Sequence, residues 1–243
     1  MPAKPVKSLF YPVWFLAGMA LLSSTVYADG IVIDKVYHPY VDALENEIEY
    51  RSVFLDSGSS KFNIDELHQL SYGKSLGERF FSEVYLIGAR TPTSGFDLEA
   101  WEIEVKWQLT EQGEYSADWG LFFEFEDELD KSVNEVTVGL LAEKELGRWS
   151  ATANLNFIQE WGSAIKDEFE TAVSLQARYR FSRAIEPALE LYAGQDTLGL
   201  GPAFGGNLNL GIRKSLNWEA GIIMGLDDKT PDSTFRMLIE YEF

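Results

Sequence analysis

Two histidines are the residues of this chain best suited to acid, base or metal chemistry, and their spacing argues against each role. His68 precedes Ser71 by three positions, which in a strand places the two side chains on opposite faces, so they form no Ser-His pair. His38 is too distant in sequence to give a metal-binding spacing with His68, and the chain has no cysteine. We therefore expect no catalytic residue, no metal and no cofactor, with a lipid-modifying enzyme that uses His68 as a minor alternative.

Carboxylates dominate the charge of the chain. It has 39 Asp and Glu against 20 Lys and Arg, a formal net charge of −19, and such a field repels nucleic acid. Several glutamates stand two positions apart, such as Glu102 with Glu104 and Glu124 with Glu126. Because a strand points every second side chain to the same face, each pair would repel unless cations or water lie close.

The element that carries the first pair is a strand spanning residues 98–109. Its apolar side chains alternate with polar ones: Trp101, Ile103, Val105, Trp107 and Leu109 against Glu102, Glu104, Lys106 and Gln108. A period of two indicates a strand with one apolar and one polar face. The same alternation is clear at 119–126, 149–157, 169–181, 204–213, 218–226 and 235–243, and weaker at 45–55, 67–76, 80–90, 133–145 and 185–195.

These segments predict an all-β protein of about 12 strands, which is an even number. The length of each segment is close to that expected of a membrane-spanning strand. Short turns, such as Glu111-Gln112-Gly113, alternate with longer acidic or glycine-rich loops. That asymmetry is typical of a transmembrane antiparallel up-and-down β-barrel with both chain ends in the periplasm. A soluble sandwich or lipocalin-like barrel is disfavoured, because about eight strands already give a filled core and aromatic residues gather near the strand ends.

The N-terminus has the features of a cleaved signal peptide. Lys4 and Lys7 precede an apolar run that is too short for a transmembrane helix, and small or modest side chains at Val26 and Ala28 suit cleavage before Asp29. We therefore divide the chain into a signal peptide, residues 1–28, a periplasmic or plug segment, residues 29–44, and a barrel, residues 45–243.

The last strand carries a more specific signal. Phe243 ends the chain and Tyr241 stands two positions before it, which resembles the C-terminal signature of Gram-negative outer-membrane β-barrel proteins. The resemblance implies an outer-membrane location, contact with the lipid bilayer and lipopolysaccharide, and assembly by periplasmic chaperones and the barrel-assembly machinery. In that family Tyr241 and Phe243 would act as the assembly signal.

The polar faces of the strands would line the lumen and decide the function. Candidate pore-lining residues are Glu102, Glu104, Lys106, Glu124, Glu126, Arg178 and Arg180. Inward carboxylates outnumber inward cations, which favours a narrow, porin-like passive channel for small cationic or neutral solutes. The alternative is a closed structural barrel in which the same side chains are locked in ion pairs.

Overall fold

The computed structural model describes residues 32–56, 64–91, 95–129, 132–163 and 165–243. Within them the chain forms twelve strands, one for each predicted segment: β1 (Asn46–Asp56), β2 (Glu66–Ser75), β3 (Phe80–Arg90), β4 (Phe96–Gln108), β5 (Asp118–Glu128), β6 (Val133–Leu146), β7 (Trp149–Gly162), β8 (Glu168–Tyr179), β9 (Glu186–Ala193), β10 (Leu198–Gly211), β11 (Lys214–Gly225) and β12 (Ser233–Glu242). The predicted signal peptide, residues 1–28, lies outside the described residues. The predicted all-β class is confirmed.

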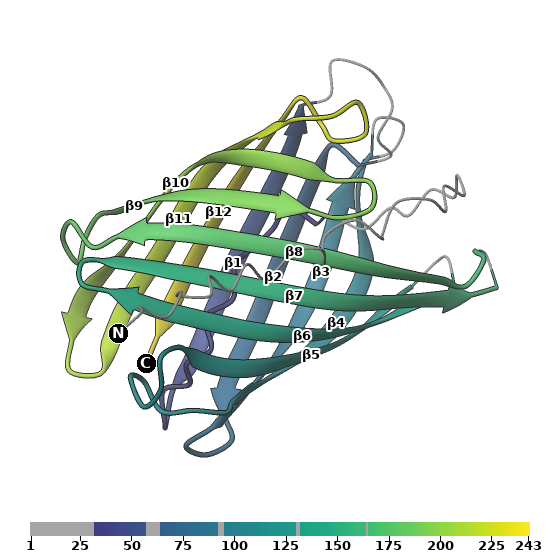
Figure 1. Cartoon of the computed structure of the whole chain (residues 1–243). Coiled ribbons are helices and arrows are strands. Elements are labelled where there is room, and N and C mark those ends of the chain that lie inside the picture. Colours follow the sequence, from purple (N-terminus) through teal and green to yellow (C-terminus); the bar gives the residue numbers. More distant parts are fainter. Residues whose placement is uncertain (1–31, 57–63, 92–94, 130–131, 164) are drawn as a thin grey trace, which may run out of the picture.

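The strands close into one barrel (Figure 1). Each strand pairs antiparallel with its neighbour in the sequence, and β1 pairs with β12 over a register that runs from Glu47 opposite Glu242 to Asp56 opposite Ser233. Because the first and last strands pair, no edge strand is left with unpaired backbone groups. The up-and-down barrel predicted from the sequence is therefore confirmed.

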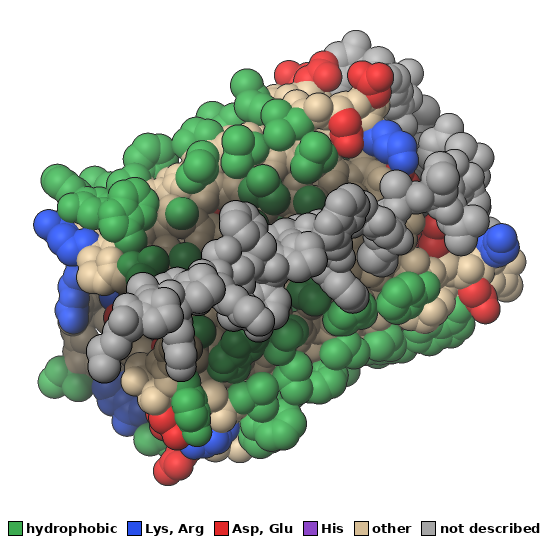
Figure 2. Space-filling view, in the orientation of Figure 1, with side chains coloured by type: hydrophobic (Ala, Val, Ile, Leu, Met, Phe, Trp, Pro, Cys, Tyr) green, Lys and Arg blue, Asp and Glu red, His purple; other side chains and the backbone are tan. Residues whose placement is uncertain are grey.

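The barrel is apolar outside and polar inside. Along β3, Val84 and Leu86 are half exposed on the outer surface, whereas Glu83 and Tyr85, which alternate with them, are buried in the lumen. Figure 2 shows apolar side chains over much of the visible wall and charged ones gathered toward its two ends. This arrangement reverses that of a soluble barrel and suits a wall surrounded by lipid. None of the described residues forms a helix long and apolar enough to cross a membrane.

The connections define two ends of the barrel. We call the end where β1 begins and β12 ends the proximal end, and the opposite one the distal end. One proximal connection is longer than the predicted Glu111–Gly113 turn, because it occupies residues 109–117. Asp118 accepts a hydrogen bond from the backbone of Gly113 at 2.8 Å, and the Thr110 hydroxyl accepts one from the backbone of Trp119 at 2.8 Å. These side-chain bonds stabilise a compact loop where alternation alone indicates a tight turn.

Candidate functional site in the barrel lumen

Residues 32–44, which we call the inner segment, lie inside the barrel. Their side chains and backbone bond to wall residues of five strands: Asp34 to Arg51, Lys35 to Glu49 (2.7 Å), Tyr37 to Glu104 (2.5 Å) and to Asn154, His38 to Glu143 (2.6 Å), Tyr40 to Asp118 (2.9 Å) and Val41 to Gln108 (2.8 Å). The bonds extend along most of the segment, so it is fixed to the wall at many points.

Apolar packing also holds the inner segment. Ile33 and Val36 are almost fully buried and form a cluster with Tyr192 of β9 and Ile223 of β11. Figure 1 places these strands and β1 in one closed wall, so the segment contacts the wall both here and at its ion pairs. Burial of apolar side chains stabilises such contacts by roughly 25 cal/mol per Å².

The charge of Lys35 suits its place in the lumen. Burial alone would lower the pKa of its ammonium group, but Glu49 and Glu83 outweigh that effect and hold the pKa well above its usual value. Lys35 is therefore charged, and its ammonium group neutralises part of the acidic wall.

The inner segment separates two cavities of the lumen, both of which are lined by Lys35 and Tyr37. The proximal cavity has a volume of about 990 Å³ and extends to the turns at Gln112 and Lys214. The distal cavity has a volume of about 240 Å³ and extends to Ile64 and Val133 near the opposite loops. A twelve-strand barrel thus has more interior than its wall side chains fill, and the inner segment takes up part of the rest.

The two cavities differ in charge. Ten acidic and six basic side chains line the proximal cavity. Eight glutamates line the distal cavity: Glu99, Glu102, Glu124, Glu126, Glu128, Glu135, Glu160 and Glu170. Among the described residues that line it, Lys35 is the one basic side chain. The distal half of the lumen therefore carries the stronger negative potential.

The four glutamates predicted to line a pore lie together on the inner wall. Glu104 is opposite Glu124, and Glu102 is opposite Glu126, on the paired strands β4 and β5. Glu102 and Glu104 are buried, while Glu124 and Glu126 are partly exposed to the lumen. Carboxylates directly opposite one another repel, so this part of the wall costs stability and attracts cations.

The predicted cations lie elsewhere. Arg51 of β1, which was not among the predicted cations, approaches the four glutamates. Its Nη2 atom lies 3.8 Å from Glu104. Lys106 and Arg178 line the proximal cavity. Arg178 lies 3.8 Å from Glu143, whereas Arg180 is at the proximal rim, 2.6 Å from Glu145. Period two specifies the face of a side chain and not its height in the barrel, so the sequence alone did not show that Arg178 and Arg180 lie at another level than the four glutamates.

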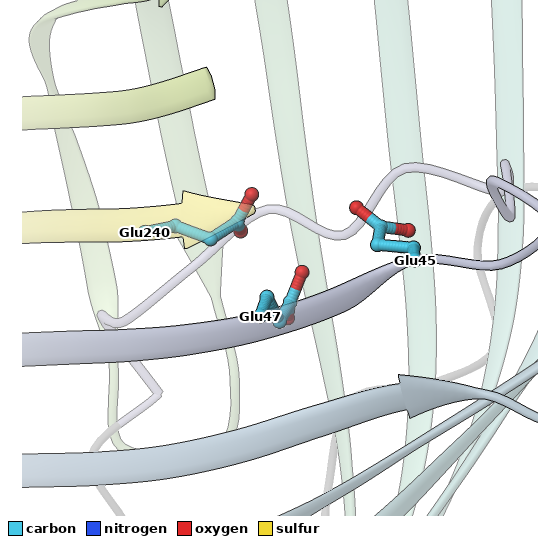
Figure 3. Close-up of side chains that lie close together, drawn as sticks. All are labelled: Glu45, Glu47 and Glu240. Carbon is cyan, nitrogen blue, oxygen red and sulfur yellow. The ribbon is translucent and has the colours of Figure 1, made fainter. Parts of the chain in front are cut away.

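Other inward charges form ion pairs. Arg236 is buried. Its Nε donates to Glu190 and its Nη1 donates to Glu219, both at 2.9 Å. Figure 3 shows a different arrangement at the proximal mouth, where the carboxylates of Glu47 on β1, Glu240 on β12 and Glu45, which directly precedes β1, lie close together. The lumen thus combines paired charges with groups of carboxylates, and we assign no ion to these groups.

The histidines have different neighbours. The Nδ1 atom of His68 lies 2.7 Å from the Tyr50 hydroxyl on the outer wall, where its ring also contacts Phe54 and Phe96. Ser71 points inward and donates to Glu83 at 2.8 Å. The two side chains are on opposite faces, as the spacing predicts. The Nδ1 atom of His38 lies 2.6 Å from Glu143, inside the barrel.

The two C-terminal aromatic residues lie at the seam of the barrel. The rings of Tyr241 and Phe243 stack with centroids 5.5 Å apart. The backbone of Phe243 exchanges two hydrogen bonds with Asn46, at 2.8 and 3.2 Å, and so closes the pairing of β1 with β12.

The sequence contained two signals for the inner segment that alternation did not reveal. Phe122 occupies an inward position among glutamates, and its ring lies 4.3 Å from that of Tyr37. Gly120 stands inside β5, where a glycine often marks the close approach of another backbone. A Cβ atom added there would lie 3.1 Å from the Cα of Pro39.

Comparisons with known proteins identify the fold. No protein-family model and no curated protein matches the sequence. The structure is similar to the KdgM porin (TM-score 0.53, 13% identity, 81% of this chain and 99% of that one). It is also similar to the NanC porin (0.55, 8%, 81% and 98%) and to an outer membrane channel from Pseudomonas putida F1 (0.54, 15%, 89% and 99%). The chain therefore has the fold of Gram-negative outer-membrane channel barrels.

Proposed function

We propose that this protein is a narrow, cation-preferring channel of the outer membrane that the inner segment plugs at rest. The proximal end would face the periplasm and the distal end the outside. The observation that carries the proposal is the divided lumen, in which a bonded segment separates two cavities. If the segment moves, the cavities join into one path lined mainly by carboxylates, which would favour cations and neutral solutes over anions.

The charge of the lumen supports a difference in solute between this protein and one of its structural neighbours. The KdgM porin has been solved in complex with oligogalacturonate, a chain of carboxylate-bearing sugars. The distal cavity of this protein is lined by eight glutamates and by Lys35. Such a wall would repel a polyanion, so we propose that the two proteins share a fold and differ in the charge of their solutes.

The wall and the ends of the barrel support the proposed surroundings. The apolar outer face would contact the lipid bilayer, with lipopolysaccharide around the distal loops. Tyr241 and Phe243 would serve as the signal for the barrel-assembly machinery after export by residues 1–28 and escort by periplasmic chaperones. Within the predicted segment 29–44, the described residues 32–44 would then form the plug and not a free periplasmic arm.

A second candidate is a closed structural barrel. The bonds of the inner segment and the buried pairs of Arg236 favour it, because both fill the lumen with satisfied polar groups. A lipid-modifying enzyme has less support. His68 faces outward, as such an enzyme requires, but Ser71 points into the lumen and donates to Glu83.

A disulfide between the inner segment and the wall separates the first two candidates. A Cβ atom added at Gly120 lies 3.1 Å from the Cβ of Pro39, near the roughly 3.5–4.5 Å of a disulfide. The native chain has no cysteine. The double variant Pro39→Cys, Gly120→Cys should therefore form one bond that ties the plug down.

In planar bilayers we expect current steps from this double variant in reducing buffer and none after oxidation. Each single-cysteine variant serves as a control and should behave alike in both buffers. In asymmetric salt the reversal potential should have the cation-selective sign. Steps that persist after oxidation would refute the plug, and absence of steps in every state, with the heat-dependent gel migration of a folded barrel intact, would favour the closed barrel.

A further inference from the structure

The distal cavity contains a row of directly opposed glutamates. In the register of the sheet, Glu102 is opposite Glu126, Glu126 is opposite Glu135, and Glu135 is opposite Glu160, on strands β4 to β7. We call these four residues the acidic row, and all of them line the distal cavity. Neighbouring strands lie about 4.8 Å apart, so the row extends over roughly 14 Å. Like charges in directly opposed positions destabilise a sheet, so the row has a cost that the fold alone does not explain.

A neutral acceptor from another strand also faces this cavity. Gln69 of β2 lines it, is 8% exposed, and has a buried Oε1 atom for which the described residues offer no hydrogen-bond partner. Glu170 of β8 is 9% exposed, and its buried Oε1 atom likewise has no partner within the described part of the chain. A buried acceptor without a donor costs about 1–3 kcal/mol. A ligand that brings N–H donors into the cavity would satisfy both atoms.

The same cavity has apolar wall between these acceptors. Ile87, Ala100 and Phe122 are buried residues that line it, and Ile158 and Val133 lie beside the acidic row. A small hydrated metal ion gains nothing from apolar surface, because its ligands are oxygen atoms and water. A molecule with methylene groups between its charges would contact both the apolar wall and the carboxylates.

From these observations we infer that the distal cavity binds a linear aliphatic polyamine. Its ammonium groups would donate to carboxylates of the acidic row and to Gln69, and its methylene chains would lie on the apolar wall. Short methylene chains space the ammonium groups at a distance comparable to the about 4.8 Å between strands. The inference rests on the proposed function in one respect, that the bound polyamine would be a solute of the channel.

Calorimetry on the detergent-solubilised mature protein tests the site without any measurement of current. Spermidine should bind saturably, and more tightly than Mg²⁺ or methylammonium at equal ionic strength. The double variant Glu135→Gln, Glu160→Gln should weaken spermidine binding by roughly tenfold or more, because each lost charge-assisted hydrogen bond is worth about 1.5–3 kcal/mol. Gln69→Met, which keeps the length of the side chain and removes its acceptor, should weaken binding by a smaller factor.

Glu45→Gln, Glu240→Gln is the matched control, since both residues line the proximal cavity. It removes the same charge and should leave spermidine binding unchanged. The inference is overturned if the wild type shows no saturable binding, if the control weakens binding equally, or if Mg²⁺ displaces spermidine as effectively as spermidine displaces itself. If the acidic-row variant fails to fold, unchanged binding by Gln69→Met overturns it instead. If the protein binds spermidine but never conducts, the polyamine site stands and the proposed channel function fails.

Discussion

The backbone N–H and C=O of Tyr37 are both bonded to one side chain, that of Asn154. The N–H donates to Oδ1 and the carbonyl accepts from Nδ2, each at 2.8 Å. Asn154 is 1% exposed. Its side-chain amide pairs with the backbone of Tyr37 as the backbone of a neighbouring strand would. The inner segment is thereby held in a defined register on β7 at the level where it separates the two cavities.

Replacing this amide should release the inner segment. In Asn154→Leu two hydrogen bonds are lost, each worth about 0.5–1.5 kcal/mol, so we expect the released population to rise roughly tenfold. Val36 is 2% exposed in the bound segment, and in a Val36→Cys background its labelling by a water-soluble maleimide reports release. Asn156→Leu, on the same face of the same strand, is the control and should label at the parental rate. Equal labelling rates in all three proteins would contradict the register role of Asn154.

A side chain at Gly120 should displace the inner segment sterically. The added Cβ of Gly120→Leu would meet the Cα and Cβ of Pro39 at 3.1 Å. A small shift relieves that contact, as in the cysteine variant, but the three further carbon atoms of leucine need space that Pro39 occupies. We expect the variant to show current steps more often than the wild type in planar bilayers. Gly95→Leu is the control, because no atom of the described residues lies within 4 Å of its added Cβ. A Gly120→Leu barrel that folds and shows steps no more often than the wild type would argue that the segment does not close the path.

The strands could be predicted from the sequence because lipid outside and water or charge inside impose a strict period of two. That period determines the face of Glu102 and Glu104 but says nothing of what fills the lumen. The inner segment has no repeating pattern of its own. Its place depends on contacts between residues far apart in the sequence, such as Tyr37 with Asn154 and Pro39 with Gly120.

The pairing of charges was equally inaccessible to the sequence. Arg51 of β1 approaches Glu104 of β4, because the relative height of the two side chains in the barrel depends on the register of the strands between them. The inward side chain of Phe122 was likewise not explained by the sequence. As an aromatic residue at an inward position it interrupts the polar face, and only its contact with Tyr37 explains it.

Phe243 should act in assembly through its ring more than through its backbone. Deleting the residue removes both the ring and the two backbone bonds to Asn46, whereas Phe243→Ala removes the ring alone. We expect both changes to lower the amount of folded protein in the outer membrane. Molecules of Phe243→Ala that do insert should keep ordinary conductance.

Phe235→Ala is the control for this prediction. Phe235 is an outward aromatic residue of β12, and its exposed fraction of 39% is close to the 42% of Phe243, which directly follows the strand. It should reach the membrane in nearly normal amount, as judged by immunoblots of membrane fractions with and without boiling. Normal insertion of Phe243→Ala, or an equal loss in Phe235→Ala, would count against a specific assembly signal.

The acidic wall should set the ion preference of the open channel. Glu102, Glu104, Glu124 and Glu126 lie on two adjacent strands and face the lumen, so converting all four to glutamine removes their field while preserving side-chain size. The reversal potential in asymmetric salt should shift toward zero, and more strongly at low salt, because the Debye length grows from about 10 Å at 0.1 M to about 30 Å at 0.01 M. Since directly opposed carboxylates repel, the variant should fold at least as well as the wild type.

A matched variant neutralises Glu78, Glu114, Asp228 and Asp232, which are exposed and lie in the connections, and it should keep most of the selectivity. An unchanged reversal potential in the first variant, or an equal shift in the second, would mean that the lumen glutamates do not control which ions pass.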